Sequence, residues 1–296
     1  MKQKTLWGRI IWAVARRGWL NAMSDEAYLK LIYKNKLRKP LDLQHPITFN
    51  EKLQWLKLYD HNPKYITLAD KYAAREFIAQ TIGEQYLFPL LGVWNHPKDI
   101  AWDELPEQFV LKCTHDSGGV VLCRNKKTMN RDSIYETLFS AWSRNFYYQG
   151  REWPYRDIQP RILAEPLMCE AGQNELLDYK LMVFNGTVRC SFVCSNRTRE
   201  LHVTFFDIEW RRMPFERHYP QAPNPIPKPK AYEEMVKLAE QLAEGLPFVR
   251  VDFYEIDGHP YVGELTLYPG SGFEEFTPSN WDCILGDWLT LPERRV

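Results

Sequence analysis

The segment that decides the fold covers residues 249–266 and reads VRVDFYEIDGHPYVGELT. Side chains on both sides of its Asp-Gly-His triplet alternate in the manner of two antiparallel strands joined by a tight turn. Because successive side chains of a strand point to opposite faces, Arg250 and Asp252 share one face, and so do Glu264 and Thr266. The pairing register determines whether these two polar faces coincide.

Two registers follow from two loop lengths. A three-residue loop over 257–259 gives pairs whose residue numbers sum to 516, which places Asp252 opposite Glu264 and is the register we expect. A two-residue Asp257-Gly258 turn gives a sum of 515 and puts the carboxylates on opposite faces. Facing carboxylates repel, which raises the pKa of at least one, and Mg²⁺ is the hard cation that relieves this repulsion. A solvated, non-functional hairpin is the alternative.

The rest of the chain predicts an α+β protein in which helices come first. Residues 24–86 are expected to be helical, with a helix over 49–59 and another over 65–82 that ends at Gly83. An Asn185-Gly186 turn predicts a further hairpin. Further helices are expected at 132–148 and 231–243, and strands at 86–94, 109–114, 120–123, 162–169, 179–184, 188–194, 203–210, 248–254 and 261–267.

Composition indicates a soluble globular protein with little affinity for nucleic acid. The 38 basic and 38 acidic residues cancel, so no net field attracts a polyanion. The six cysteines include no C-x-x-C pair, which argues against a zinc site, and apolar neighbours around Cys113 and Cys123 suit a reducing cytoplasm.

The first 23 residues predict an amphipathic helix. Trp7, Ile10 and Ile11 lie on one side of a helical wheel, whereas Lys2 and Arg9 lie on the other. The helix either packs on its own domain or lies on the anionic inner surface of a membrane.

Two further segments have the composition of a nucleotide site. Lys112 lies in a predicted strand before the small-residue loop Asp116-Ser117-Gly118-Gly119, whose backbone N–H groups could surround phosphates beside the lysine charge. A simple turn between strands is the alternative. Glu165 interrupts an apolar strand, so it requires a protein partner or a ligand hydroxyl such as that of a ribose, unless it is an ordinary edge-strand charge.

Taken in order, these segments resemble the TupA-like (teichuronopeptide biosynthesis) ATP-grasp family of bacterial surface-polysaccharide proteins, over about residues 47–292. The resemblance rests on the segments 48–55, 69–71, 74–76, 112–119, 178–180, 184–186, 250–254 and 263–266. It implies an ATP-grasp fold over 86–296, with two α+β subdomains (about 86–160 and 161–296) that hold ATP between them, after an N-terminal helical region over 24–85.

The resemblance also implies residue roles. Lys112 contacts the α- and β-phosphates, the loop from Asp116 through Ser117 and Gly118 to Gly119 covers the triphosphate, and Lys180 adds a second cation. The adenosine hinge comprises Glu165, Pro166, Leu167 and Met168. Asp252 and Glu264 bind Mg²⁺, and Arg250 stabilises the transition state. Thr266 replaces an asparagine common in ATP-grasp enzymes, which leaves a second Mg²⁺ in doubt. Gly270, Ser271 and Gly272 are expected to contact substrate.

The implied activity is ATP-dependent ligation of a carboxylate to an amine through an acyl phosphate. The family's setting suggests a uronic-acid carboxylate on a glycan or glycan precursor as acceptor, and an amino acid or small amine as the second substrate. A glycosyltransferase is the runner-up, although the sequence has no D-x-D triplet. A non-catalytic ATP-grasp-like protein is a third reading, against which the joint presence of Lys112, Arg250, Asp252 and Glu264 argues.

Overall fold

The computed structural model describes residues 14–15, 17–168, 176–196 and 200–295. The helix predicted over 1–23 therefore lies mostly outside the described residues, and residues 17–22 form turns. Within the described part of the chain, no helix is long and apolar enough to cross a membrane.

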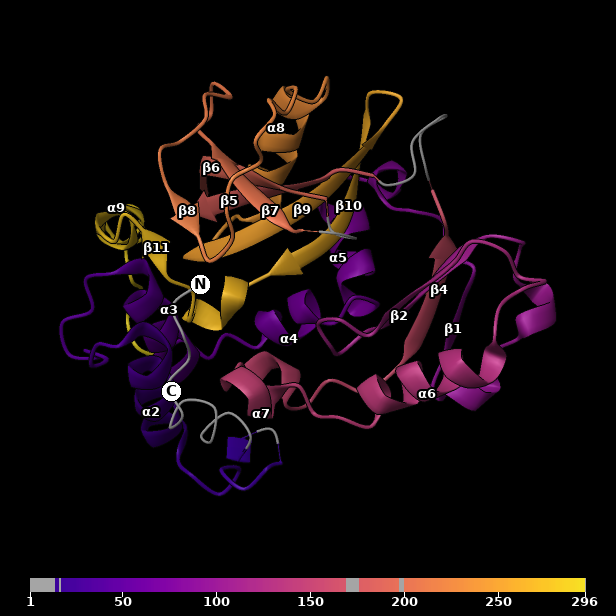
Figure 1. Cartoon of the computed structure of the whole chain (residues 1–296), viewed down its shortest axis with the longest axis horizontal. Helices are drawn as coiled ribbons and strands as arrows, with labels where there is room; N and C mark the ends of the chain where they lie inside the picture. The colour runs from indigo at the N-terminus through magenta and orange to yellow at the C-terminus, as the bar shows by residue number, and fades with distance from the viewer. Residues whose placement is uncertain (1–13, 16, 169–175, 197–199, 296) are drawn as a thin grey trace.

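The larger of the two main sheets has five antiparallel strands in the order β10-β9-β5-β6-β7 (Figure 1). Its strands are β5 (Asp178–Phe184), β6 (Thr187–Ser195), β7 (His202–Phe206), β9 (Phe248–Ile256) and β10 (His259–Thr266). The predicted Asn185-Gly186 turn joins β5 to β6, and both residues have the positive φ angles of a type I′ turn. Helix α8 (Tyr232–Leu242) covers one face, where the Tyr232 hydroxyl lies 2.8 Å from that of Ser191.

The β9–β10 hairpin reaches the expected pairing by a different route. Asp257 and Gly258 form a two-residue turn with positive φ, and the first pairs, from His259–Ile256 to Val262–Phe253, follow the 515 register. A bulge between Val262 and Glu264 then shifts the register by one residue, so that Glu264 faces Asp252. The predicted three-residue loop is therefore wrong, whereas the predicted carboxylate pairing is confirmed.

The smaller sheet has four strands in the order β1-β4-β2-β3 (Figure 1). Its strands are β1 (Gly92–Trp94), β2 (Phe109–Cys113), β3 (Val120–Cys123) and β4 (Ile162–Pro166). Helix α6 (Arg131–Trp142) packs on this sheet and shares a separate apolar core with it. Strand β4 pairs with β2, so this sheet extends past residue 160, where the sequence suggested a subdomain boundary.

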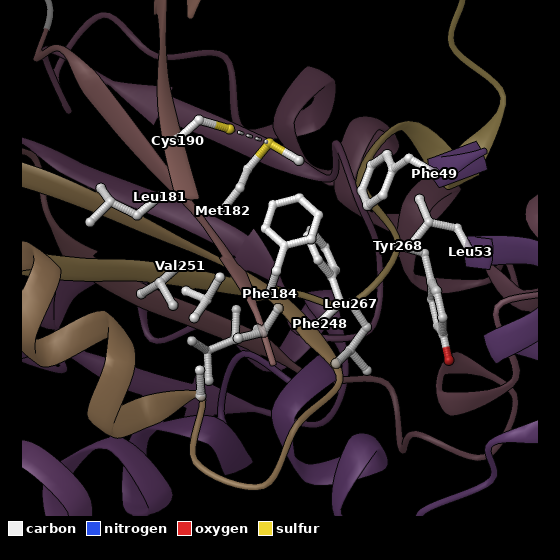
Figure 2. Packing of buried hydrophobic residues seen from close by; sticks show 14 of the residues in the cluster. Phe49, Leu53, Leu181, Met182, Phe184, Cys190, Phe248, Val251, Leu267 and Tyr268 are labelled. Carbon is white, nitrogen blue, oxygen red and sulfur yellow. Dashed lines mark hydrogen bonds between the residues drawn. The ribbon is translucent and has the colours of Figure 1, made fainter. Parts of the chain in front are cut away.

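The N-terminal helices belong to the core of the larger sheet. They are α2 (Asp25–Leu37), α3 (Phe49–Tyr59), α4 (Lys64–Ala69) and α5 (Ala73–Ile82). Thr48 and Glu51 form a capping box that starts α3. Figure 2 shows Phe49 of α3 beside Phe184, and its ring centroid lies 5.5 Å from that of Phe184 and 5.1 Å from that of Phe248. The helical region and the larger sheet therefore form one hydrophobic core.

Two predicted helices are each divided in the structure. The helix expected over 65–82 breaks between α4 and α5, where Asp70 accepts a hydrogen bond from the Tyr72 N–H and ends the first segment. The helix expected over 132–148 separates into α6 and the short α7 (Tyr147–Gly150). Strand β8 (Glu216–Arg217), which precedes α8, pairs with β11 (Phe276–Thr277), and helix α9 (Asn280–Trp288) follows β11.

Candidate active site

A small cavity between the two main sheets brings together three of the predicted charged residues, Lys112, Glu165 and Glu264. Strand β10 forms one wall, β2 and β4 form the opposite wall, and α4 and α5 close it from the side. The charged side chains that line it are Lys71, Arg75, Lys112, Glu165 and Glu264. Residues far apart in sequence therefore place three cations and two carboxylates around one enclosed space.

Arg250 and Lys180 bind the first predicted metal carboxylate, Asp252. The Arg250 guanidinium forms two hydrogen bonds to Asp252, from Nε at 2.6 Å and from Nη2 at 2.7 Å. Lys180 lies opposite Asp252 on β5 and pairs with both Asp252 and Asp178. Burial raises the pKa of Asp252, and the charges of Arg250 and Lys180 oppose that shift. The carboxylate is therefore held by two cations on the polar face of the sheet.

Glu264, the second predicted metal carboxylate, is stabilised by cations rather than strained by its neighbour. Lys71 Nζ lies 3.0 Å from Glu264, and Arg250 Nη2 lies 3.5 Å from it. Burial alone would raise the pKa of Glu264, but Lys71 and Arg250 outweigh burial and lower the pKa to about 2. The pKa of Asp252 is raised, as expected for at least one of the two carboxylates, but the main cause is burial rather than repulsion by Glu264, and Arg250 contacts both carboxylates.

Lys112 and Glu165, the predicted phosphate and ribose residues, form an ion pair across the smaller sheet. Lys112 Nζ lies 2.6 Å from one Glu165 oxygen, and Arg75 lies 3.0 Å from the other. Arg75 also donates to the Phe88 carbonyl at 2.6 Å, which fixes the guanidinium beside the segment that precedes β1. The carboxylate that interrupts an apolar strand is thus compensated by two cations.

The two glycines of the predicted phosphate loop have different roles. Gly118 is exposed with φ +112°, and a Cβ there would meet no atom within 4 Å. Gly119 is buried, and a Cβ there would lie 2.8 Å from Ala141 Cβ, so its small size serves packing on α6. Only Gly118 therefore leaves open space of the kind that the sequence argument assigned to both.

The loop is tied to the carboxylate pair by a single lysine. Lys71 donates to the Asp116 carbonyl at 2.6 Å while it pairs with Glu264. The Asp116 carboxylate accepts from the Ser117 N–H at 2.7 Å and pairs with Arg144 at 2.7 Å. Asp116 therefore shapes the loop, and Ser117 is exposed beside it.

Of the predicted hinge residues, only Glu165 lines the cavity. Pro166 ends β4 and pairs with Phe109, and the Leu167 N–H donates to the Gln108 carbonyl at 3.4 Å. Met168 is the last described residue of this segment. Pro166 and Leu167 thus continue the pairing of β4 with β2 beyond Glu165.

The donor set beside the bulge suits a hard divalent cation. Asp252 and Glu264 supply carboxylate oxygens, and the buried Thr266 hydroxyl has no hydrogen-bond partner among the described residues. In the described part of the chain, no group of three or more Asp, Glu, His or Cys side chains forms a metal site. Mg²⁺ commonly binds proteins through one or two carboxylates together with substrate phosphates, so these residues fit that ion as partners of a bound triphosphate.

The predicted substrate loop, Pro269–Gly272, has an unusual backbone fixed by a buried lysine. Gly270, Ser271 and Gly272 all have positive φ angles, between 54° and 62°. Lys57 of α3 is 1% exposed and donates to the Ser271 carbonyl at 2.8 Å, to its hydroxyl at 2.9 Å and to the Gly150 carbonyl at 2.8 Å. Burial lowers the pKa of Lys57 to about 7, which the Glu152 carboxylate partly opposes. The loop conformation therefore depends on α3.

Sequence reasoning gave no role to three cations of this region: Lys57, Lys71 and Arg75. Lys71 and Arg75 lie in segments that carried the family resemblance, which was the available signal for them. Lys57 lies in the amphipathic pattern of α3, where a lysine ordinarily faces solvent. Its contacts with the loop come from tertiary packing and have no local signature.

The family model described as TupA-like ATPgrasp matches residues 51–290. The chain belongs to this family. Its two sheets and their helices accordingly constitute an ATP-grasp fold, as the sequence predicted. The comparison with curated proteins found no match.

Solved structures with the ATP-grasp fold are distant in sequence. D-alanine–D-alanine ligase from Helicobacter pylori is 14% identical with a TM-score of 0.46, and the alignment covers 84% of this chain and 69% of that one. PurK, an N5-carboxyaminoimidazole ribonucleotide synthetase solved with ADP, is 16% identical with a TM-score of 0.45, covering 73% and 50%. The ligase PsnB, solved with a minimal precursor, Mg and ADP, is 14% identical with a TM-score of 0.39, covering 73% and 57%. This chain thus spans little more than half the length of PsnB.

Proposed function

We propose that this TupA-like ATP-grasp protein is an ATP- and Mg²⁺-dependent ligase that activates a carboxylate and joins it to an amine. The observation that carries the proposal is the polar face of β9 and β10, where Arg250 contacts both Asp252 and Glu264. Around it, five cations face four carboxylates: Lys71, Arg75, Lys112, Lys180 and Arg250 against Glu165, Asp178, Asp252 and Glu264. The excess positive charge favours a polyanion such as ATP.

The residues have separable tasks in this proposal. Lys112 and Lys71 take the phosphates, since each reaches the cavity and is paired there only with a carboxylate or a carbonyl. Glu165 exchanges part of its ion pair for the ribose hydroxyls. Asp252, Glu264 and Thr266 hold Mg²⁺, which neutralises charge on the triphosphate and leaves the γ-phosphoryl group susceptible to attack.

The proposed reaction has two steps. A carboxylate oxygen of the acceptor attacks the γ-phosphorus and the bond to the bridging β,γ-oxygen breaks. ADP is the leaving group, and the acceptor becomes an acyl phosphate. An amine then attacks the acyl carbon, inorganic phosphate leaves, and the amine nitrogen loses a proton. Arg250 lies where negative charge develops on the transferred group and contributes preorganised electrostatic stabilisation. A uronic-acid carboxylate on a glycan or glycan precursor is the acceptor we propose, in surface-polysaccharide biosynthesis at the cytoplasmic face of the membrane.

Hydroxylamine trapping tests this proposal. The full chain is incubated with Mg²⁺-ATP, a panel of uronic acids and hydroxylamine, and ADP and hydroxamate are measured together. We expect equal amounts of both with at least one acid, and neither product without Mg²⁺. Nucleotide turnover without hydroxamate for every acid would contradict the acyl-phosphate route.

A further inference from the structure

The polar face of the larger sheet continues beyond the carboxylate pair onto two aromatic rings. One cross-strand row contains Glu264, Asp252, Lys180, Phe192 and Phe205, in the order of the strands from β10 to β7. Side chains in such a row share one face of the sheet. The buried rings of Phe192 and Phe205, which are 2% and 0% exposed, therefore form an aromatic floor beside the candidate site.

A second arginine lies over this aromatic floor. Arg217 of β8 has its Cζ 4.8 Å from the centroid of Phe192 and 5.3 Å from that of Phe205. Arg250 has its Cζ 5.8 Å from the same Phe192 centroid. Two guanidinium groups thus lie within 6 Å of one ring, so Arg217 is close to the proposed reaction centre.

Arg217 is buried, and its ion pair with Glu274 does not satisfy all of its hydrogen-bond donors. Its side chain is 7% exposed, and its Nε lies 2.9 Å from Oε2 of Glu274, which is 22% exposed. The angles of this ion pair do not make a hydrogen bond, and the buried Nε and Nη1 atoms have no hydrogen-bond acceptor among the described residues. Leaving buried polar groups without a hydrogen-bond partner is unfavourable, and it is more unfavourable when the group is charged. The pair therefore has unused hydrogen-bonding capacity on a charged group.

Glu274 connects this pair to the substrate loop. A Cβ on Gly270 would lie 2.3 Å from Glu274 Oε2, so the carboxylate rests directly against the loop backbone. Asn50 Nδ2 donates to the Glu274 carbonyl at 2.9 Å and fixes the backbone at that position. Only the Glu274 carboxylate can therefore change its partner when a ligand binds at the loop.

We infer that Arg217 and Glu274 form the subsite for the amine substrate, and that this substrate is an α-amino acid. The inference rests on the proposed ligase function. A zwitterion offers a carboxylate to Arg217 and an ammonium group to Glu274, so the buried arginine and the half-buried carboxylate both stay paired when it binds. A simple amine would leave Arg217 without an anion, and removing one partner of a buried pair is strongly unfavourable. The subsite thus discriminates through the α-carboxylate.

Binding calorimetry tests the inference on the full chain. The standard α-amino acids are titrated with and without Mg²⁺ and a non-hydrolysable ATP analogue, beside the matched carboxamide and decarboxylated amine of any that binds. We expect at least one amino acid to bind, and its carboxamide and amine to bind at least about tenfold more weakly, as a lost charged hydrogen bond predicts. Arg217→Gln should remove this preference while the affinity for the ATP analogue stays within about twofold of the parent.

Two variants control for structural damage. Glu274→Gln should weaken the amino acid and leave its α-hydroxy analogue unaffected, because only the ammonium group loses its partner. Arg212→Gln removes an exposed arginine from the same segment and should change nothing. The inference is overturned if no amino acid binds, if the decarboxylated amine binds equally well, or if Arg217→Gln keeps the preference. Failure to bind the ATP analogue would instead contradict the proposed function, and the titrations without nucleotide still decide on the subsite.

Discussion

Gly263 is the residue whose replacement tests the geometry of the site most sharply. It lies in the bulge that converts the 515 register of the β9–β10 hairpin into the 516 register. A Cβ on Gly263 would lie 2.6 Å from Cε2 and 3.2 Å from Cδ2 of Tyr254. Non-bonded carbon atoms are most stable at about 3.5–4.0 Å, so Gly263→Ala forces a movement of roughly 1 Å.

The expected stability cost of Gly263→Ala is about 1–3 kcal/mol, which is usual for one added methyl group in a packed site. The functional loss should be larger. If the ring holds its place, the bulge is expelled and Glu264 turns toward the apolar face of the sheet; if the ring moves, the carboxylate shifts by about 1 Å. Displacements of that size near a reacting centre cost about a hundredfold in rate.

Urea unfolding and Mg²⁺-dependent ADP release measure the two effects separately. Gly258→Ala is the matched control, because this turn glycine has φ +80° and a Cβ there would have its nearest contact, Lys230, at 3.7 Å. It should cost about 1–2 kcal/mol of stability without changing turnover. Adding Tyr254→Ala to Gly263→Ala should recover part of the activity. Parental turnover in folded Gly263→Ala would refute the role of the bulge.

The remaining predictions concern charges of the site. Lys112→Ala should abolish measurable ATP binding by calorimetry, and Gly118→Val should fold normally yet lose turnover; unchanged ATP affinity in Lys112→Ala would remove this lysine from the nucleotide site. Glu264→Gln and Asp252→Asn should both abolish ADP release. Because the folded state lowers the pKa of Glu264 to about 2, this carboxylate contributes about 3 kcal/mol to the free energy of unfolding above pH 4.5. The contribution is lost as the pH falls toward 2. The free energy of unfolding of the parent should show this pH dependence, and that of Glu264→Gln should not. The pKa of Lys57 is lowered from an ordinary 10.5 to about 7. The free energy of unfolding of the parent should therefore rise with pH between 7 and 10.5, by up to about 1.4 kcal/mol per pH unit, and Lys57→Met should lack this slope.

These charge predictions reverse one expectation from the sequence. Seen as two facing carboxylates, Asp252 and Glu264 predict a repulsion that neutral variants relieve. In the structure Lys71, Lys180 and Arg250 surround the pair, so the neutral variants should be less stable than the parent. Removing one member of a buried charge cluster costs about 3–5 kcal/mol. The three cations come from the turn between α4 and α5 and from two strands, and sequence alternation informs only about the strands.

The local features of the fold were predictable, whereas the features that depend on packing were not. The capping box before α3 and the Asn185-Gly186 turn have local sequence signatures, and both are present. The bulge at Gly263 has no such signature, because a glycine inside a strand indicates a bulge or a close contact without deciding between them. Two incorrect steps, the wrong loop length and the missing bulge, compensated each other in the predicted pairing of Asp252 with Glu264.

The site shows the same division between local and tertiary information. Lys112, Glu165, Arg250, Asp252 and Glu264 stood out because charges interrupted apolar strands, and the structure brings them to one cavity or to the sheet face beside it. Lys57 of α3, Lys71 between α4 and α5, and Arg75 of α5 contact the site through the packing of these helices on the sheets. No spacing rule within those helices specifies that contact.

The transfer of labelled oxygen tests the central claim most directly. A uronic acid carrying ¹⁸O in its carboxylate is incubated with the full chain, Mg²⁺-ATP and an amino acid, and the released phosphate is analysed by mass spectrometry. An acyl phosphate requires that one ¹⁸O atom pass from the carboxylate to phosphate for each ADP formed. We expect this one-to-one transfer with at least one uronic acid. Turnover that releases only unlabelled phosphate with every acid would contradict the account.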